Sequence, residues 1–221
     1  MKARAPAAPR LPDELGDAAG VALEDDARVA GERLDDLAAP GLTARGIDFE
    51  RARLSGCTFD GARLTRLGVR DCELERCSLS GVLSIDGSMT RTRLTDCRLS
   101  GFAWAGGTLE DVTFAGCRLD LASFRQTRLN RVVFDDCVLL EADFQDARAR
   151  FVRFERSDLT AAGFSGAAFD ASELRGCVLD DLHGIDGLRG AALEWPAIVG
   201  LAGALAGALG LRVLDDDEER A

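Results

Sequence analysis

A five-residue period runs without a gap through more than half of this chain. Of the twenty-seven positions whose numbers end in 4 or 9 between Phe49 and Leu179, twenty-five hold Leu, Phe, Val, Met or Trp, and the exceptions are Ser84 and Ala149. Positions two residues earlier are mostly small, and all seven cysteines fall among them. This period fits neither the 3.6 residues of a helical turn nor the two-residue alternation of a strand. It predicts a chain that turns a corner every five residues and returns equivalent side chains to one interior.

Successive five-residue units hold a small residue followed two positions later by Leu or Phe. Examples are CTFDG (57–61), ARLTR (62–66), CRLSG (97–101), CRLDL (117–121), ADFQD (142–146) and CVLDD (177–181). These units resemble the pentapeptide repeat family, whose usual unit is A(D/N)LXX. The resemblance implies an all-β fold, a right-handed quadrilateral parallel β-helix with four pentapeptides in each coil.

Like residues recur every twenty positions, as four sides per coil would require. We expect these columns to form the structural core of the solenoid. They are Cys57, Cys77, Cys97, Cys117, Cys137 and Cys177, with Ser157 in the vacant place; Trp104, Phe124, Phe144 and Phe164; and Phe114, Phe134 and Phe154. About seven coils fit between residues 47 and 182, and at a strand spacing of about 4.8 Å they would make a rod about 33 Å long.

The period weakens toward both ends, which divides the chain into four expected segments. Residues 1–26 are expected to form a disordered or irregular N-terminal arm, and residues 27–185 the β-helix. A turn, a helix and a short strand are expected over 186–214 as a cap or dimer contact. Residues 215–221 form an acidic tail.

One irregular place lies inside the repeat. At Ser84 the apolar residues are the two neighbours, Leu83 and Ile85, instead of the residue in phase. The tripeptide IDG at 85–87 recurs at 185–187, five coils later, where the repeat stops. We interpret the first copy as a bulge or corner distortion and the second as the exit turn.

Residues 195–210 are apolar at helical spacing, with Pro196 near the start and Gly210 at the end. We expect a helix that caps the solenoid or pairs with a second copy of the chain, through Trp195, Ile198, Val199, Leu201, Leu205 and Leu209. Seventeen uncharged residues separate Glu194 from Arg212, the lower limit for a membrane span. The segment is rich in Ala and Gly, so a membrane-associated protein anchored through 195–211 is the weaker interpretation.

The composition leaves few residues from which to build an active site, because the chain has no Tyr, one His and one Lys. Stacked thiols could hold a soft metal, but no C-x-x-C pair and no nearby His accompany them, and buried Cys behaves as a small hydrophobe. We therefore expect no metal and no cofactor. His183 lacks a nucleophile to activate, and Asp86 and Asp186 are interpreted as turn formers. No catalytic residue is predicted.

The net charge of −11 is concentrated near the two ends of the chain. Residues 41–185 carry twenty-two acids and nineteen arginines, so the rod is nearly balanced, and direct binding of nucleic acid is not expected. Seven cysteines are an odd number in no disulfide pattern, and no secretory signal is found. The cytoplasm is the expected location.

These observations predict a non-enzymatic interaction or scaffold protein that presents a rigid rod to an unidentified protein partner. A homodimer through residues 195–210 is expected with it. The resemblance implies an alternative, since some members of the family look like B-form DNA, bind DNA gyrase and protect it from quinolones. Such mimicry needs a sustained negative face, which the residue counts do not indicate.

Overall fold

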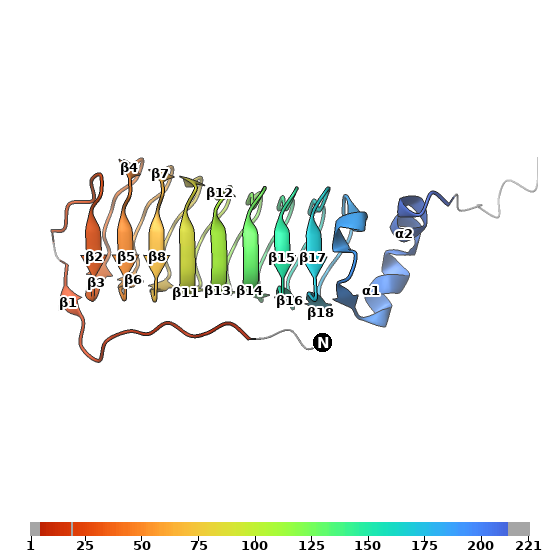
Figure 1. Cartoon of the computed structure of the whole chain (residues 1–221), viewed down its shortest axis with the longest axis horizontal. Coiled ribbons are helices and arrows are strands. Elements are labelled where there is room, and N and C mark those ends of the chain that lie inside the picture. Colours follow the sequence, from red (N-terminus) through yellow and green to blue (C-terminus); the bar gives the residue numbers. More distant parts are fainter. Residues whose placement is uncertain (1–4, 19, 212–221) are drawn as a thin grey trace, which may run out of the picture.

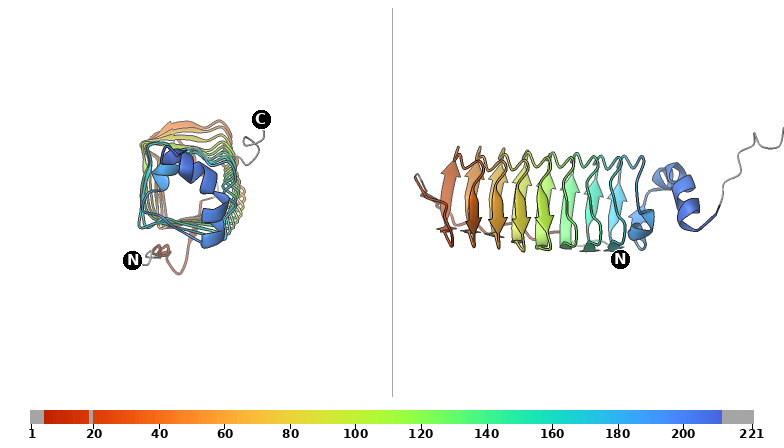
Figure 2. Two further views of the ribbon diagram at one scale, coloured as in Figure 1. Left: turned by 90° about the vertical axis from the view of Figure 1, so that its right-hand side faces the viewer. Right: turned by 90° about the horizontal axis from the view of Figure 1, so that it is seen from above.

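Residues 5–18 and 20–211 are described by the computed structural model, and most of them form a rod of stacked four-sided coils (Figure 1 and Figure 2). Coils lie in register, twenty residues apart, so that Leu94 pairs with Phe114 and Phe114 with Phe134 in parallel ladders. The rod has about nine turns. The expected seven was too low, because Val29 and Leu34 are already buried in a coil that begins before residue 47.

Hydrogen-bonded strands form two of the four walls and the N-terminal part of a third, and single bridges form the rest of the third wall and the fourth. The β2–β17 wall contains β2 (Arg28–Ala30), β5 (Asp48–Glu50), β8 (Gly68–Arg70), β11 (Ser88–Thr95), β13 (Thr108–Ala115), β14 (Arg128–Asp135), β15 (Arg148–Arg150) and β17 (Ala168–Asp170). The β3–β18 wall contains β3 (Glu32–Asp35), β6 (Arg53–Ser55), β9 (Glu73–Glu75), the second halves of β11, β13 and β14, then β16 (Arg153–Glu155) and β18 (Glu173–Arg175). The β4–β12 wall contains β4 (Thr43–Arg45), β7 (Arg63–Thr65), β10 (Leu83–Ile85) and β12 (Ala103–Ala105). The bridge wall joins successive coils from Ala38–Thr58 to Asp158–Val178.

Each pentapeptide spans one wall, and its buried pair and its corner explain the period. In residues 57–61, Cys57 and Phe59 are buried, Thr58 between them lies on the outer side, and Gly61 turns the corner with a φ of 69°. A positive φ is easiest for Gly and is tolerated by Asp. Asp86 accordingly turns its corner with a φ of 53°. Two buried positions and one turn residue in every five therefore produce a four-sided coil.

Aromatic side chains fill the C-terminal half of the interior. The ring centroid of Phe134 lies 4.9 Å from that of Phe114 and 5.0 Å from that of Phe154, in parallel stacks. Phe124 and Phe144 form a second stack at 5.2 Å, and Phe134 meets Phe144 edge to face. Such contacts contribute stability beyond the area that is buried. The N-terminal half of the interior holds mainly Leu and Val with a few aromatic residues, such as Phe49 and Phe59, and leaves an apolar cavity of about 40 Å³.

Trp104 accounts for the irregular place in the repeat. β10 keeps full register with its neighbours and pairs Ser84 with Leu64 on one side and Trp104 on the other, so the expected bulge is wrong. The indole of Trp104 is fully buried, and a Cβ added at Gly87 would lie 2.8 Å from two of its ring carbons. A large side chain at one inward position is thus matched by small residues around it.

Replacing Gly87 with Ala should destabilise the rod by about 1–3 kcal/mol, because the added methyl overpacks this part of the core. The added Cβ would also lie 2.7 Å from Ser84 Oγ. Trp104→Phe in the same chain should recover much of the loss, since a phenyl ring lacks the two crowding carbons. Gly163→Ala is the control, because its Cβ would meet nothing nearer than 3.8 Å. Urea unfolding compares five chains: the unmodified chain, Gly87→Ala, Trp104→Phe, the double variant and the Gly163→Ala control. Simple additivity of the Gly87→Ala and Trp104→Phe effects would contradict the packing explanation.

Different elements close the two ends of the rod. At the N-terminal end, β1 (Gly16–Asp17) pairs with β3, and residues 5–15 run back along the outside of the coils (Figure 1). At the other end, the 3-10 helix η1 (Ile185–Leu188) forms at the second IDG, and β19 (Ala192–Leu193) pairs with β18. The strand expected over 211–214 lies, apart from Leu211, outside the described residues, as does the acidic tail.

A C-terminal helical segment is present and is divided in two. α1 spans Trp195–Gly200 and α2 spans Ala202–Ala208, with Leu201 between them. Leu201 is buried against the end of the core, and Ala197 and Leu205 pack beside it. Burial of this one side chain explains why the apolar segment bends instead of continuing as one straight helix.

Candidate interaction surfaces

The cysteine column lies inside the rod, and its thiols donate hydrogen bonds to the backbone. Each Sγ donates to a carbonyl oxygen twenty-three residues earlier, in the preceding coil, as from Cys57 to Leu34 (3.4 Å) and from Cys97 to Leu74 (3.6 Å). Ser157 takes the vacant place and makes the equivalent bond at 3.2 Å. The buried members are Cys57, Cys77, Cys97, Cys117 and Cys137, and Cys177 is half-buried.

The pKa values of several buried thiols are raised, which favours their protonated form. The hydrogen bond with Cys117 raises the pKa of Cys97 to about 12, with burial acting in the same direction, and burial raises the pKa of Cys72 to about 11. A thiol must lose its proton to act as a nucleophile or to ligate a metal. Within residues 5–18 and 20–211, no three His, Cys, Asp or Glu side chains are grouped so as to hold a metal ion.

The aromatic columns are interior as well, and the remaining polar candidates do not converge. The fully buried aromatic residues of the two columns are Trp104, Phe124, Phe144, Phe164, Phe114, Phe134 and Phe154. His183 is exposed on the last coil, where its backbone bridges to Gly163. Asp186 follows it in η1, whereas Asp86 is five coils away; both are exposed. These groups do not form a shared site.

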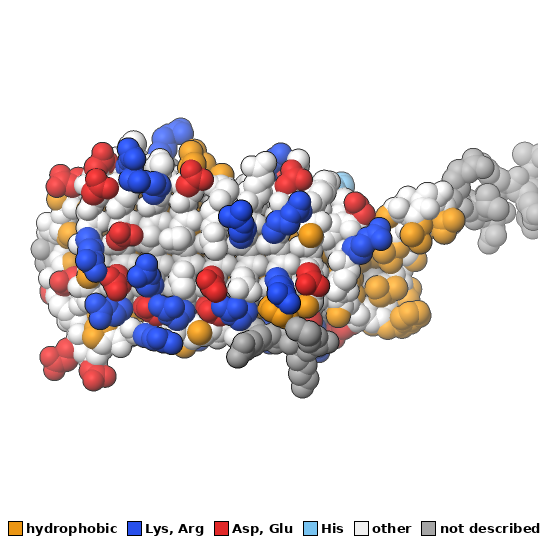
Figure 3. Space-filling view, viewed as in Figure 1, with side chains coloured by type: hydrophobic (Ala, Val, Ile, Leu, Met, Phe, Trp, Pro, Cys, Tyr) orange, Lys and Arg blue, Asp and Glu red, His pale blue; other side chains and the backbone are white. Residues whose placement is uncertain are grey.

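Charged side chains of both signs are mixed on the outer walls, as Figure 3 shows for the β2–β17 wall. Ion pairs join neighbouring coils, for example Arg28 with Glu50 (2.6 Å) and Arg53 with Glu73 (2.8 Å). The bridge wall and the corner after it have two arginines and the acids Asp60, Asp120, Glu141, Asp158, Asp180 and Asp181. Even there, the pentapeptides at 77–81 and 97–101 have no acid, so the described rod has no continuous negative strip on that side.

One corner, the one after the β2–β17 wall, is different. Four successive coils place Asp71, Arg91, Asp111 and Arg131 there, all at positive φ, and we call these residues the corner column. The guanidinium of Arg91 binds both oxygens of Asp71 at 2.6 Å, and that of Arg131 binds both oxygens of Asp111 at 2.6 and 2.9 Å. Such two-pronged bonds are the strong form of the pair.

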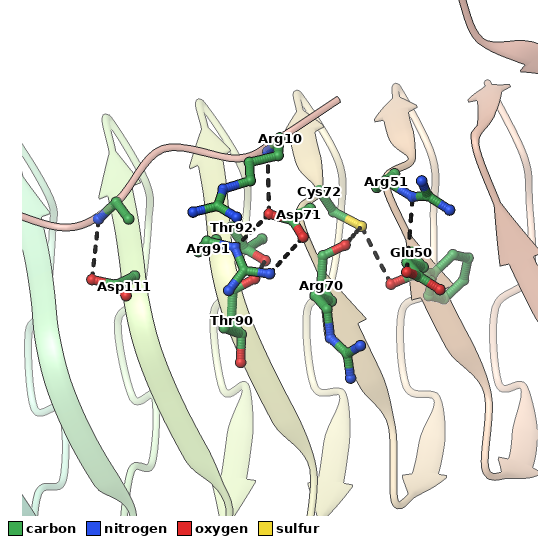
Figure 4. Close-up of polar contacts among 12 residues, drawn as sticks. Arg10, Glu50, Arg51, Arg70, Asp71, Cys72, Thr90, Arg91, Thr92 and Asp111 are labelled. Atoms are coloured by element: carbon green, nitrogen blue, oxygen red, sulfur yellow. Dashed lines mark hydrogen bonds and ion pairs between the residues drawn. The ribbon is translucent and has the colours of Figure 1, made fainter. Parts of the chain in front are cut away.

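The N-terminal arm reaches the corner column (Figure 4). The backbone N–H of Arg10 donates to Asp71 Oδ1 (3.2 Å), and that of Ala7 donates to Asp111 Oδ1 (3.1 Å). Asp71 is only 5% exposed and Asp111 only 8%, although both stand at an outer corner. The hydrogen bond from the paired arginine lowers the pKa of each aspartate, with desolvation opposing it, so both carboxylates are ionised at neutral pH.

Neither the arm's contacts nor the corner column was identified from the sequence. Two signals were available: the alternation of Asp and Arg at twenty-residue spacing, and prolines at positions 6, 9 and 12. Neither indicates a contact by itself, because the two hydrogen bonds join residues 61 and 104 positions apart.

Apolar side chains remain uncovered on the outer side of α1 and α2. Of the six residues expected to form a dimer or cap surface, Ile198, Leu201 and Leu205 turn at least partly toward the rod. The other three are exposed by 60 to 76%: Trp195, Val199 and Leu209. Figure 3 shows hydrophobic side chains gathered at this end of the molecule. An apolar surface of this kind often marks a contact with another protein.

Two family models match the chain. One, described as a pentapeptide repeat region, matches residues 107–183, and the other, described as pentapeptide repeats in eight copies, matches residues 45–81. No curated protein matches the chain.

Solved structures of pentapeptide repeat proteins also match. A trypsin-treated form of QnrB1, a plasmid-mediated fluoroquinolone resistance protein, is 22% identical; the match covers 86% of this chain and 99% of that one, with a TM-score of 0.37. HetL, a pentapeptide repeat protein involved in heterocyst differentiation regulation in the cyanobacterium Nostoc sp. strain PCC 7120, is 18% identical; the match covers 79% and 92%, with a TM-score of 0.30. The two family models together cover more than half of the sequence, and with the four-sided coils and their five-residue period they show that this chain belongs to the pentapeptide repeat family.

Proposed function

We propose that this chain is a non-enzymatic interaction protein, a rigid rod that offers its walls to a protein partner and pairs with a second copy through the outer side of α1 and α2. The observation that carries the proposal is the division of side chains: Leu, Phe and Cys fill the interior, and polar groups cover the walls. Each coil is bonded to both neighbours, so the walls are formed before a partner arrives, which lowers the cost of binding.

The interior supports a binding role over a catalytic one. The uncharged polar residues buried in it are Ser84, Thr92, Thr127, Ser157 and Ser172. Four of these five hydroxyls donate to backbone carbonyls, and Ser84 packs in the coil next to Trp104. Catalysis needs an acid, a base or a nucleophile converging on a shared pocket. The seven unpaired thiols further favour a reducing compartment such as the cytoplasm.

The paired state should depend on the exposed side chains of α1 and α2. Trp195→Asp replaces the most exposed large apolar side chain of this surface with a charge and should halve the molar mass measured by light scattering. Leu121→Asp is the matched control, because Leu121 is another exposed large apolar residue (60%, against 76% for Trp195) but lies on the rod. Its mass should equal that of the unmodified chain. Equal masses for all three chains would contradict pairing through this surface.

The alternative drawn from the family resemblance, a DNA mimic that binds gyrase, has weaker support. A mimic of the DNA backbone needs closely and regularly spaced negative charges. The walls of the described rod carry arginines among their acids, with cross-coil pairs such as Arg53–Glu73. Regarding the third interpretation, association with a membrane, no helix in the described part of the chain combines the length and the apolar character that a membrane span requires.

A further inference from the structure

Regularly spaced prolines restrict the backbone of the N-terminal arm to polyproline II or extended geometry. Prolines occupy positions 6, 9 and 12, and each has its φ held near the polyproline II value. The residue before each proline is also restricted to extended or polyproline II geometry. Between residues 5 and 12, only Ala7 and Arg10 are neither a proline nor the residue before one. These are the two residues whose backbone N–H groups reach the corner column.

The spacings of the arm and the rod coincide. Three residues of polyproline II advance by about 9.3 Å, and two coils of stacked strands advance by about 9.6 Å. Ala7 and Arg10 are three residues apart, and their acceptors, Asp111 and Asp71, are two coils apart. An N–H group at every third residue can therefore meet an aspartate at every second coil without strain in either element.

The rod presents these acceptors in a fixed orientation. Arg91 and Arg131 hold the two aspartates by two bonds each, so that one oxygen of each carboxylate is also turned to the arm. A polyproline II segment has no internal hydrogen bonds, so its N–H groups are free to donate to such acceptors. Pro6 and Pro9 are half-buried where the arm passes over the coils, whereas Ala8 is exposed.

We propose that the corner column is a binding track for polyproline II segments that have proline at every third residue, and that residues 5–12 occupy it as an intramolecular ligand. The track selects a segment with a free N–H directly after a proline, repeated three residues later. This inference goes beyond the proposed pairing of α1 and α2, and it does not depend on it.

The test uses the full chain with the double substitution Ala7→Pro and Arg10→Pro. Both substitutions favour polyproline II but remove the N–H groups that donate to the aspartates. The arm should leave the track, and a dye-labelled peptide with the sequence of residues 5–13 should then bind, as measured by fluorescence anisotropy. The unmodified chain should bind the peptide at least tenfold more weakly, because its own arm competes at an effective concentration in the millimolar range.

Ala8→Pro is the matched control chain. It adds a proline to the same segment but keeps both donors, so it should behave like the unmodified chain. A peptide with proline at the positions of Ala7 and Arg10 should not bind to any of the chains. Equal binding of the natural peptide to the unmodified chain and the double variant would overturn the proposal.

Two further measurements keep the inference testable if the free peptide binds too weakly to detect. Trypsin should cut after Arg10 at least fivefold faster in the Ala7→Pro chain than in the Ala8→Pro chain, and equal rates would overturn the proposal. The molar mass of the double variant should equal that of the unmodified chain. A lower mass would mean that the arm docks on another copy, which would overturn the intramolecular assignment.

Discussion

The rod should unfold cooperatively between about pH 9 and pH 11, because its buried thiols cannot ionise without leaving the interior. The hydrogen bond with Cys137 raises the pKa of Cys117 to about 12, the bond with Cys117 does the same for Cys97, and burial raises that of Cys72 to about 11. Hydrogen bonding with Cys77 raises the pKa of Cys57 as well. For Cys77, the bond with Cys57 lowers the pKa, but the bond with Cys97 and burial raise it further, to about 12.

The sign of the effect follows from these upward shifts. The stability that the protonated thiols contribute is fully present below their unfolded pKa of about 8.5 and is lost as the pH rises toward the folded pKa. In this pH range, each of these thiols lowers the free energy of unfolding by about 1.4 kcal/mol per pH unit. The five thiols together therefore lower it by about 7 kcal/mol per unit. A typical free energy of unfolding of about 10 kcal/mol is lost within about two pH units at this rate. The chain has no Tyr and one Lys, so few other groups titrate in this range.

Far-UV circular dichroism and thiolate absorbance, followed together against pH, measure this transition. The two signals should change in step. A Cys97→Ser, Cys117→Ser chain should unfold about one pH unit higher, because two of the five titrating groups are gone. Ser157 shows that serine fits this column. Thiolate absorbance that rises well before the dichroism falls would show that the thiols ionise inside the folded rod.

Phe134→Asp should abolish the folded rod or reduce its free energy of unfolding by at least about 5 kcal/mol. Phe134 is fully buried, with its ring stacked between Phe114 and Phe154. The substitution removes these contacts and leaves a carboxylate in an interior that has no partner for it at this position. Because every coil supports the next, damage in a central coil removes support from both halves.

Thr113→Asp is the control for this substitution. Thr113 lies on the outer side of β13, next to the buried Phe114, and pairs with Val133 of the following coil. A carboxylate there remains in contact with water, so its effect should stay within about 1 kcal/mol. Urea unfolding compares the two variants. Similar midpoints would mean that residue 134 does not face the interior.

The four-sided coil could be expected because the five-residue units resemble the pentapeptide repeat family, and the twenty-residue columns agree with four sides per coil. Every fifth residue must be large and apolar, and every twentieth must stack on itself, so the columns of Cys and Phe identify both the wall and the register. The coil before residue 47 lies within the expected β-helix of residues 27–185 but was left out of the count of seven coils. Its period is weak, since Ala39 and Ala44 stand where later coils have Leu or Phe. Both alanines still belong to the core region, Ala44 as a buried residue and Ala39 packed against it. A short side chain can therefore occupy an inward position of the coil without showing the five-residue pattern.

The irregularity at Ser84 was misread because its cause lies in another coil. A serine between Leu83 and Ile85 looks like a shifted strand when only its neighbours are considered. In the structure the size of Trp104, twenty residues later, explains both Ser84 and Gly87. The contact between the arm and the corner column was missed for a related reason. This contact requires that three residues of the arm span the same distance as two coils of the rod. The agreement cannot be seen in the sequence of the arm or of the rod taken alone.

The two-residue strands at the ends of the β3–β18 wall have a consequence for how the molecule behaves when it is concentrated. Stacked parallel strands leave unpaired backbone groups at each end, and such an edge is a template on which another chain can add and extend the stack into a fibre. β1 covers one edge and β19 the other, each with only two residues. Beyond these short strands the chain turns into the arm on one side and into α1 on the other. This wall thus ends at two-residue strands from which the chain turns away, so another chain adds less readily to either end of the wall than it would to a full-length edge.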